Sequence, residues 1–217
     1  MTRDWHEWHR EYDDPASSLS ERLAVVRSRL SSLLAAAAPG PVRLLGLCSG
    51  DGRDTLPVVA ESGVEVTAVL VELDAELASA ARGSAAALGL GGVDVRTADA
   101  GDTSCAVDAV PADVVMACGI FGNITDDDIA RTVATLPTLL APGGAVIWTR
   151  GHRVPRDPSR WEGDPADHVR SRFADAGFDE IDFVRPERHS FRVGVHRWPG
   201  PSSSYRRGVR MFEFVQG

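Results

Sequence analysis

The stretch Val42–Val58, with the sequence VRLLGLCSGDGRDTLPV, places the tightest constraint on how this chain folds. A short apolar run ends in a loop that has glycines at positions 50 and 52, and an apolar run then resumes. Glycine allows backbone dihedral angles that other residues avoid, and it lets a ligand approach the backbone closely. The pattern predicts a strand, a ligand-binding loop and a helix, as at the ligand-binding edge of an open α/β sheet.

Short apolar runs alternate with amphipathic stretches along the rest of the chain. We expect strands at 42–48, 65–72, 93–97, 112–118 and 144–150, and helices at about 54–62, 75–88, 126–140 and 164–176. Near the end, FDEIDFV and RMFEFV flank a Pro/Gly/Ser-rich loop at Pro199 to Ser204, which predicts an antiparallel pair that closes one edge. The expected fold is α/β, a Rossmann-like, doubly wound, mostly parallel seven-stranded sheet with an antiparallel edge strand and an N-terminal helical lid.

The N-terminal region predicts a long helix that starts near Ser18, with Glu21 three residues later, and stops before Pro39-Gly40-Pro41. The preceding sequence DWHEWHREY gives one aromatic face at helical spacing, which consists of Trp5, Trp8, His9 and Tyr12. Such a face closes over a binding site or docks the helix on the core. His6 and His9 have helical spacing but no third ligand in view, so we expect no metal site.

The length of 217 residues and the hydrophobic content of 43% suffice for one core, and we expect a single domain over 1–217. Within it, 1–38 is the expected helical lid or cap, 42–150 is the ligand-binding core, and 151–217 holds a substrate-side loop and the C-terminal antiparallel strands.

The net charge of −8 disfavours a nucleic-acid partner, because such binding needs cationic side chains against phosphates. Three cysteines without C-x-x-C spacing predict neither a disulfide framework nor a zinc ribbon, and they fit a reducing cytoplasm. The chain starts without an apolar signal core and has no apolar run near the roughly 20 residues that span a membrane. We therefore expect a cytoplasmic monomer or homodimer with no membrane partner.

Three ligand classes compete for the glycine loop. A phosphate-binding P-loop needs a lysine, and the chain contains none. A dinucleotide loop needs a third glycine where Thr55 stands, which weakens an NAD-type oxidoreductase but leaves it as the alternative. S-adenosylmethionine carries no pyrophosphate and makes no demand for that glycine.

Over Val42 to Arg150 the chain resembles the class I S-adenosylmethionine-dependent methyltransferases. LLGLCSGDGRD is similar to the first motif of that family, VTAVLVELDAELASAAR to the second and VRTADAGD to the third, while ADVVMACGIFGNI and LAPGGAVIW match the fourth and fifth strands. The resemblance implies S-adenosyl-L-methionine as cofactor and S-adenosyl-L-homocysteine as product. It implies these cofactor contacts: Cys48, Ser49, Gly50, Asp51, Gly52, Glu72, Leu73, Asp99, Ala100, Cys118 and Gly119.

In this family the acidic residue at the position of Glu72 accepts hydrogen bonds from the ribose hydroxyls, and a carboxylate can accept both. The resemblance places Asp99 and Ala100 at the adenine edge. The chain departs from the family pattern at Gly46, where many members have an acid, and at Cys48, which replaces a glycine. Asp51 or a backbone carbonyl is then the expected contact for the methionine amino group.

The resemblance also places the methyl acceptor over the loops after the fourth and fifth strands. The catalytic candidates are Asn123 after the fourth strand, Arg150 and His152 after the fifth, and His196. The two histidines are the candidate general bases, because imidazole titrates near neutral pH. The substrate-binding candidates are Trp5, Trp8, His9, Tyr12, Phe121 and Arg153. Residues 150–217 carry 13 Arg against 10 acids, so we expect a small acceptor that bears a carboxylate or a comparable anion. We place such an acceptor in specialised metabolism. A solvated basic loop and a cofactor-binding protein without transfer activity are the alternatives.

Overall fold

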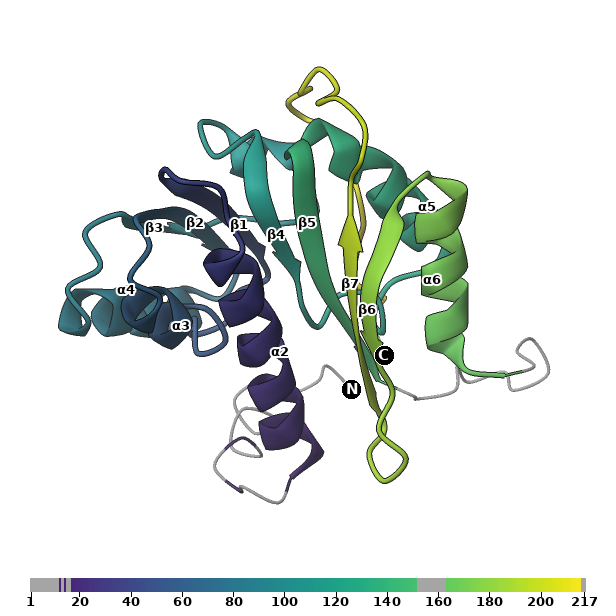
Figure 1. Cartoon of the computed structure of the whole chain (residues 1–217), viewed down its shortest axis with the longest axis horizontal. Helices are drawn as coiled ribbons and strands as arrows, with labels where there is room; N and C mark the ends of the chain where they lie inside the picture. The colour runs from purple at the N-terminus through teal and green to yellow at the C-terminus, as the bar shows by residue number, and fades with distance from the viewer. Residues whose placement is uncertain (1–11, 13, 15–16, 152–162, 216–217) are drawn as a thin grey trace.

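The structure is a computed structural model that describes residues 12, 14, 17–151 and 163–215. In this part of the chain, seven strands form one sheet in the order β3-β2-β1-β4-β5-β7-β6 (Figure 1). The strands are β1 Val42–Leu47, β2 Val66–Glu72, β3 Val93–Thr97, β4 Ala112–Ala117, β5 Leu140–Gly151, β6 Asp179–Val184 and β7 Phe191–Arg197. Strand β7 runs antiparallel to both β5 and β6, and the other pairs are parallel. The expected α/β fold, doubly wound and mostly parallel, is confirmed.

Helices cover both faces of the sheet (Figure 1). They are α2 Ser18–Ala35, α3 Leu56–Glu61, α4 Ala75–Ala87, α5 Asp126–Thr135 and α6 Pro165–Asp175, with the short 3-10 helices η2 Thr103–Ala106 and η3 Leu136–Thr138. Side chains alternate along β1, so Leu45 and Leu47 join the core beneath α5 and α6 while Leu44 joins the core beneath α2, α3 and α4. Burial on both faces explains why the strands read as nearly continuous apolar runs.

Ser17 is the N-cap of helix α2, because its hydroxyl accepts a hydrogen bond from the backbone N–H of Ser20. Its buried side chains Val26, Leu30 and Leu34 recur every four residues and pack toward the sheet. The C-terminal half of the helix is therefore a layer of the fold. The predicted lid over 1–38 stays a prediction, because most residues before Ser17 lie outside the described ranges.

The predicted partner of the sixth strand was wrong. Strand β6 pairs with Phe191–Arg197, whereas the segment RMFEFV makes one isolated bridge, between Asp102 and Arg210. Gly194 interrupts the β pattern of Phe191–Arg197, and because glycine weakens a strand, the sequence does not mark this segment as one. The glycine is required here, because a side chain at this position would overlap the indole ring of Trp148.

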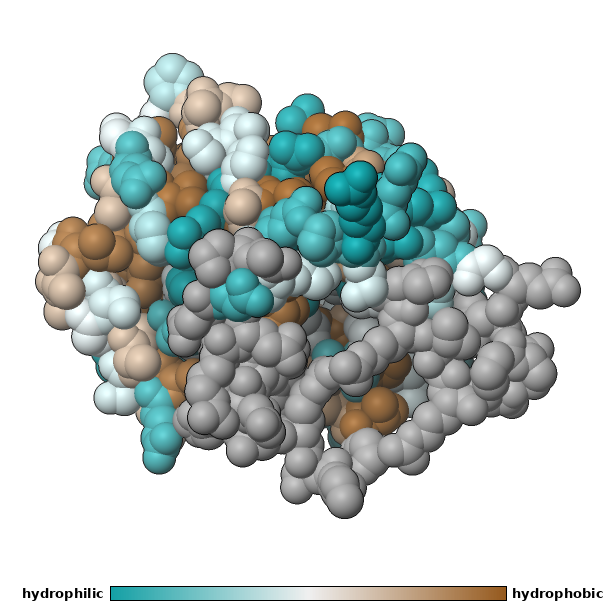
Figure 2. Space-filling model, turned by 90° about the horizontal axis from the view of Figure 1, so that it is seen from below, coloured by the Kyte–Doolittle hydropathy of each residue, from teal (hydrophilic) through white to brown (hydrophobic). Residues whose placement is uncertain are grey.

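All strands except β7 point toward the same end of the molecule, which lies at the bottom of Figure 1. Arg22 and Leu23 of α2 and the residues that follow β1 and β2 meet there, where they line one cavity. Figure 2 looks onto this end, where hydrophilic and apolar side chains lie side by side. Ligands of open α/β sheets bind at this edge. None of the helices in the described residues has the length and apolar character that crossing a bilayer requires.

Candidate functional site

A cavity of about 340 Å³ lies where β1, β2 and β3 end. All the predicted cofactor contacts except Gly52 line it. The described lining residues are Tyr12, Arg22, Leu23, Cys48, Ser49, Gly50, Asp51, Arg53, Asp54, Glu72, Leu73, Asp74, Leu77, Asp99, Ala100, Cys118, Gly119, Phe212 and Phe214.

The loop after β1 turns tightly against β2. Cys48 and Gly50 adopt left-handed backbone conformations with φ of 54° and 56°, and the N–H of Ser49 donates to the carbonyl of Val71 at 2.9 Å. Gly52 is also left-handed, at φ 75°, and a Cβ there would lie 2.6 Å from a methyl group of Leu56. Gly52 thus serves the packing of the loop on α3, and this is why it does not line the cavity.

Glu72 connects two of the loops around the cavity. Its Oε2 accepts a hydrogen bond from the N–H of Gly50 at 2.8 Å, and its Oε1 accepts one from the N–H of Asp74 at 2.9 Å. Asp74 in turn caps α4 through the N–H groups of Glu76 and Leu77. The carboxylate is therefore held at the cavity wall. Leu73 beside it lines the cavity with 66% of its surface exposed, which leaves an apolar face open for a ligand.

The third loop contributes Asp99 and Ala100. Oδ1 of Asp99 accepts a hydrogen bond from the N–H of Gly101 at 2.8 Å, and Oδ2 forms an ion pair with Arg210. The loops after β1, β2 and β3 thus bring together the glycine loop, Glu72 and Asp99, as the motif spacing predicted.

The position of Gly46 explains how the chain does without an acid there. A Cβ at this position would overlap Oγ of Ser49 and lie 2.8 Å from a methyl group of Leu70. The Ser49 hydroxyl occupies that space, is buried and has no hydrogen-bond partner in the described structure. A buried hydroxyl without a partner is costly, and its place in the cavity wall fits a ligand that would complete its hydrogen bonding.

Two lining groups come from parts of the chain that motif reasoning did not reach. Arg22 and Leu23 come from α2, while Phe212 and Phe214 come from the C-terminal tail. Tyr12, predicted on the acceptor side, lines the cavity as well, and its hydroxyl accepts a hydrogen bond from Arg22. The loop itself offered a signal for Arg53 and Asp54, because both directly follow the glycines. Neither α2 nor the tail carries such a signal.

The electrostatic character of the lining is acidic. Its carboxylates are Asp51, Asp54, Glu72, Asp74 and Asp99, against the guanidinium groups of Arg22 and Arg53. Asp51 is paired with Arg53, and burial raises the pKa of Asp54. Burial also raises the pKa of the Cys48 and Cys118 thiols, so both stay protonated near neutral pH and are poor nucleophiles.

Four predicted catalytic or substrate residues lie outside the cavity lining. Phe121 is fully buried and packs edge-on against Trp148, with ring centroids 5.9 Å apart. Arg150 is only 6% exposed and donates a hydrogen bond to the carbonyl of Phe121. Asn123 donates to the carbonyl of Gly119 at 2.7 Å, which holds the loop after β4. In these positions the three side chains support the loop, and none of them lines the cavity.

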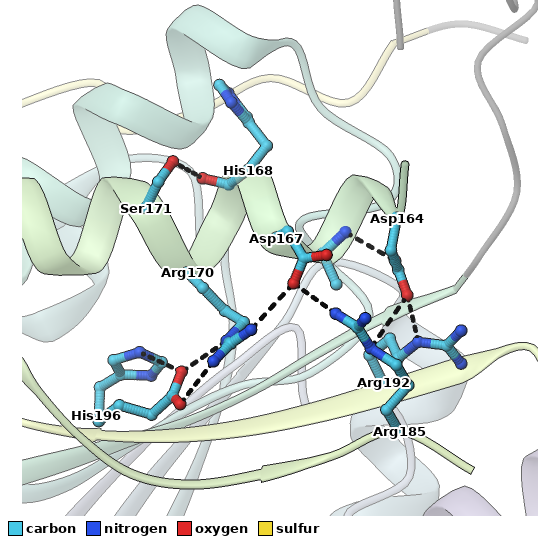
Figure 3. A network of polar contacts seen from close by, with 10 residues as sticks. Asp164, Asp167, His168, Arg170, Ser171, Arg185, Arg192 and His196 are labelled. Carbon is cyan, nitrogen blue, oxygen red and sulfur yellow. Dashed lines mark hydrogen bonds and ion pairs between the residues drawn. The ribbon is translucent and has the colours of Figure 1, made fainter. Parts of the chain in front are cut away.

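His196 is the fourth of these residues, and its burial in the core corrects its prediction as a general base. Figure 3 shows it on β7 beneath α6, next to the carboxylate of Glu180 that also binds Arg170. Its ring stacks on Phe173 with centroids 4.3 Å apart, and Nδ1 accepts a hydrogen bond from the indole of Trp148 at 3.0 Å. Burial lowers the pKa of His196 to about 4. Successive side chains of a strand point to opposite faces of the sheet, and the position of His196 on β7 directs its side chain into the core. The remaining candidates lie outside the described residues: Trp5, Trp8, His9, His152 and Arg153.

Comparisons with known proteins agree with this geometry. Residues 44–144 match the family model described as "Methyltransferase domain". No curated protein sequence matches the chain. Among solved structures, the magnesium protoporphyrin IX methyltransferase ChlM of Synechocystis PCC 6803, with bound SAM, aligns with a TM-score of 0.64 and 15% identity, over 89% of this chain and 90% of that chain.

Two further structures show how widely the fold is shared. A protein of Bordetella parapertussis described as a possible exported protein aligns with a TM-score of 0.64 and 20% identity, over 83% of this chain and 68% of that chain. The [4+2]-cyclase SpnF aligns with a TM-score of 0.58 and 18% identity, over 79% of this chain and 81% of that chain. Because these identities are low, the likeness establishes the fold alone.

Proposed function

We propose that this chain, whose residues 44–144 match the family model described as "Methyltransferase domain", is a class I S-adenosylmethionine-dependent methyltransferase that transfers a methyl group to a small-molecule acceptor. The single observation that carries the proposal is the acidic cavity at the ends of β1, β2 and β3. S-adenosylmethionine is a sulfonium cation that also bears an ammonium group, and a lining with more carboxylates than guanidinium groups attracts positive charge.

The same lining argues against the dinucleotide alternative. The pyrophosphate of NAD is a dianion, and anion sites rely on backbone N–H groups and cationic side chains. Here the N–H of Gly50 in the glycine loop already donates a hydrogen bond to the carboxylate of Glu72. The sheet order also differs from the all-parallel dinucleotide fold, because antiparallel β7 lies between β5 and β6.

Each part of the cofactor has side chains suited to it. Glu72 would accept hydrogen bonds from the ribose hydroxyls, while Leu73, Asp99 and Ala100 would contact the adenine. The amino-acid end of the cofactor carries a carboxylate and an ammonium group, which suit Arg22 and Asp54 respectively. The hydroxyl of Ser49, which has no hydrogen-bond partner in the described structure, also lines the cavity.

The cofactor supplies an electrophilic methyl group on sulfur. The chain's own part is alignment, because in-line displacement requires the acceptor atom, the methyl carbon and the sulfur to be collinear. Cys48 and Cys118 line the cavity as protonated thiols, so they do not compete with the acceptor for the methyl group. With His196 in the core, a general base would come from His152, or the acceptor would need none.

For the acceptor, we infer a small molecule. The net charge of −8 supports this class, because it disfavours a polyanionic nucleic acid as the acceptor. The carboxylate on the acceptor remains a prediction that rests on Arg153, because Arg150 is buried against Phe121. A specialised-metabolism role, a cytoplasmic location and a monomeric or dimeric state are proposed on the sequence alone.

Transfer of a labelled methyl group from S-adenosylmethionine to a metabolite extract tests the reaction. We expect a labelled low-molecular-weight product with the parent protein and little with Glu72→Ala. Binding of S-adenosylhomocysteine without any labelled product across a broad extract would favour a cofactor-binding protein that lacks transfer activity.

A further inference from the structure

The C-terminal tail, residues 198–215, returns from the far end of β7 to the end of the sheet at the bottom of Figure 1. It contains no helix and no named strand in its described part, yet Phe212 and Phe214 both line the cavity. A segment that follows the last strand of the sheet therefore forms a wall of the site.

The tail is anchored on the loop that carries Asp99. The N–H of Met211 donates to the carbonyl of Gly101 at 2.7 Å, and the N–H of Thr103 donates to the carbonyl of Val209 at 3.0 Å. A Cβ on Gly101 would overlap the carbonyl oxygen of Phe212. The glycine at position 101 thus allows the tail to lie directly on the loop.

On the other side, the tail is tied to α5 and to the loop after β4. The hydroxyl of Thr132 donates to the carbonyl of Met211 at 3.2 Å, and the N–H of Val215 donates to the carbonyl of Asn123 at 2.9 Å. Met211 and Phe212 are buried, so the tail is held by packing as well as by hydrogen bonds.

Two side chains of this anchored tail are placed at the cavity, one through its ion pair with a lining residue and one as a lining residue itself. Arg210 forms an ion pair with Oδ2 of Asp99, whose Oδ1 is held by the N–H of Gly101. Phe214 lines the cavity and is 40% exposed, as is Leu73 at 66% from the loop after β2. Exposed apolar side chains on both of these cavity-lining segments suit a flat apolar ligand group.

We propose that the tail completes the adenine subsite, in which Phe214 contacts the base and Arg210 is a positioning residue that orients the carboxylate of Asp99 toward the exocyclic amino group. This rests on the proposed function. Bases bind well to aromatic side chains because every base has an apolar face. A carboxylate held by two donors keeps one orientation, in which its remaining lone pairs can accept from an amino group.

Calorimetric titration with S-adenosylhomocysteine and with 5′-methylthioadenosine, which lacks the amino-acid end, tests the role of Phe214. Phe214→Ala should weaken binding of both ligands by a similar factor of about ten. The matched control is Val215→Ala, which alters the neighbouring exposed residue outside the cavity lining and should leave both affinities unchanged. Unchanged affinities in Phe214→Ala, or a loss for S-adenosylhomocysteine alone, would overturn the assignment.

The role of Arg210 is tested by base selectivity. S-inosylhomocysteine carries a carbonyl in place of the exocyclic amino group, so the parent should prefer S-adenosylhomocysteine. Arg210→Met should reduce this preference by about three- to tenfold, while the exposed control Arg207→Met should keep it. If Arg210 were only structural, Arg210→Met would weaken binding of both nucleosides equally, or it would lower Tm without changing the selectivity. Either result would overturn the positioning role of Arg210.

The two proposals fail in different ways. A parent protein that does not bind S-adenosylhomocysteine contradicts the proposed function. A parent that binds it, with tail variants indistinguishable from their controls, contradicts only the adenine subsite.

Discussion

The carboxylate of Glu72 accepts a hydrogen bond from the backbone N–H of Gly50, with 2.8 Å between Oε2 and the nitrogen. This contact joins the loop after β1 to the end of β2. A second contact, from the N–H of Asp74 to Oε1, carries the connection to the start of α4. One side chain thus sets the spacing of two loops that border the same cavity.

Replacing Glu72 by alanine should weaken binding of S-adenosylhomocysteine by about 1.5–3 kcal/mol, the scale of hydrogen bonds to a charged group. The fold should remain, because the core on both sides of β2 is untouched. Calorimetric titration measures the change, and Glu61→Ala, an exposed carboxylate at the end of α3, is the control. Equal binding by Glu72→Ala and the parent would show that the second motif is wrongly assigned.

Gly46→Ala should destabilise the protein by about 1–3 kcal/mol, because the added methyl group overlaps Oγ of Ser49 and crowds Leu70. Ser49→Ala removes the obstructing hydroxyl, so the double variant should recover part of the loss. Urea unfolding of the four proteins gives the coupling free energy. Strictly additive effects would mean that Ser49 does not fill the space above Gly46.

Ser49→Ala by itself makes a separate prediction. In the ligand-free protein it should be nearly neutral for stability, because it removes a buried hydroxyl that has no hydrogen-bond partner in the described structure. S-adenosylhomocysteine should nevertheless bind more weakly, by about 1 kcal/mol. Thermal unfolding with and without the ligand separates the two effects, and an unchanged ligand-induced shift in Tm would remove Ser49 from the cofactor site.

The buried imidazole of His196 predicts a loss of stability in mild acid. Burial and Arg170 lower its pKa, Glu180 opposes them, and the folded value is about 4 against 6.5 in the unfolded chain. A base whose pKa is depressed by folding stabilises the fold fully above the unfolded pKa, and that stability falls as pH drops from 6.5 toward 4. The expected loss over this range is about 2 kcal/mol.

His196→Gln isolates this contribution, because its side-chain carbonyl can still accept the hydrogen bond from Trp148. Urea unfolding at several pH values should show a flatter dependence between pH 4 and 6.5 for the variant. Asp128 and Asp164, whose pKa values are lowered from 3.8, act below this window. Parallel curves for the variant and the parent would indicate that His196 does not titrate as described.

The three thiols should react slowly with a disulfide reagent at pH 8. Burial raises the pKa of Cys48 and Cys118, and it raises the pKa of Cys105 to about 11, so little thiolate is present. Cys48 and Cys118 line the cavity, so saturating S-adenosylhomocysteine should slow their labelling further and leave Cys105 unaffected. Mass spectrometry of labelled peptides distinguishes them. If the ligand does not change the labelling rates of Cys48 and Cys118, then S-adenosylhomocysteine binds outside this cavity.

The sequence predicted the part of the site that local order determines. In a parallel sheet, loops after neighbouring strands meet at one edge, so recognising the strands before Cys48, Leu73 and Ala98 is enough to bring the glycine loop, Glu72 and Asp99 together. The same reasoning fails for contacts that depend on tertiary packing. Phe212 and Phe214 reach the cavity only because the tail lies on Gly101. The pattern of apolar residues in RMFEFV does not predict this contact.

The acceptor side shows a second limit. Positions after the fourth and fifth strands were expected to face a substrate, but side chains alternate along a strand, and a shift of one residue reverses their direction. Arg150 lies on the same face of β5 as Trp148 and is buried. His196 lies on β7 directly opposite Val146 of β5, and it points into the same core. Knowing the end of a strand therefore does not identify which side chains line the site.

The most direct test of this account is the relative affinity of the parent protein for S-adenosylhomocysteine and NAD, measured by calorimetric titration in one buffer. The acidic lining and the carboxylate on the N–H of Gly50 predict binding of S-adenosylhomocysteine at a 1:1 ratio and binding of NAD at least tenfold weaker. NAD binding as tight as or tighter than that of S-adenosylhomocysteine would contradict the account.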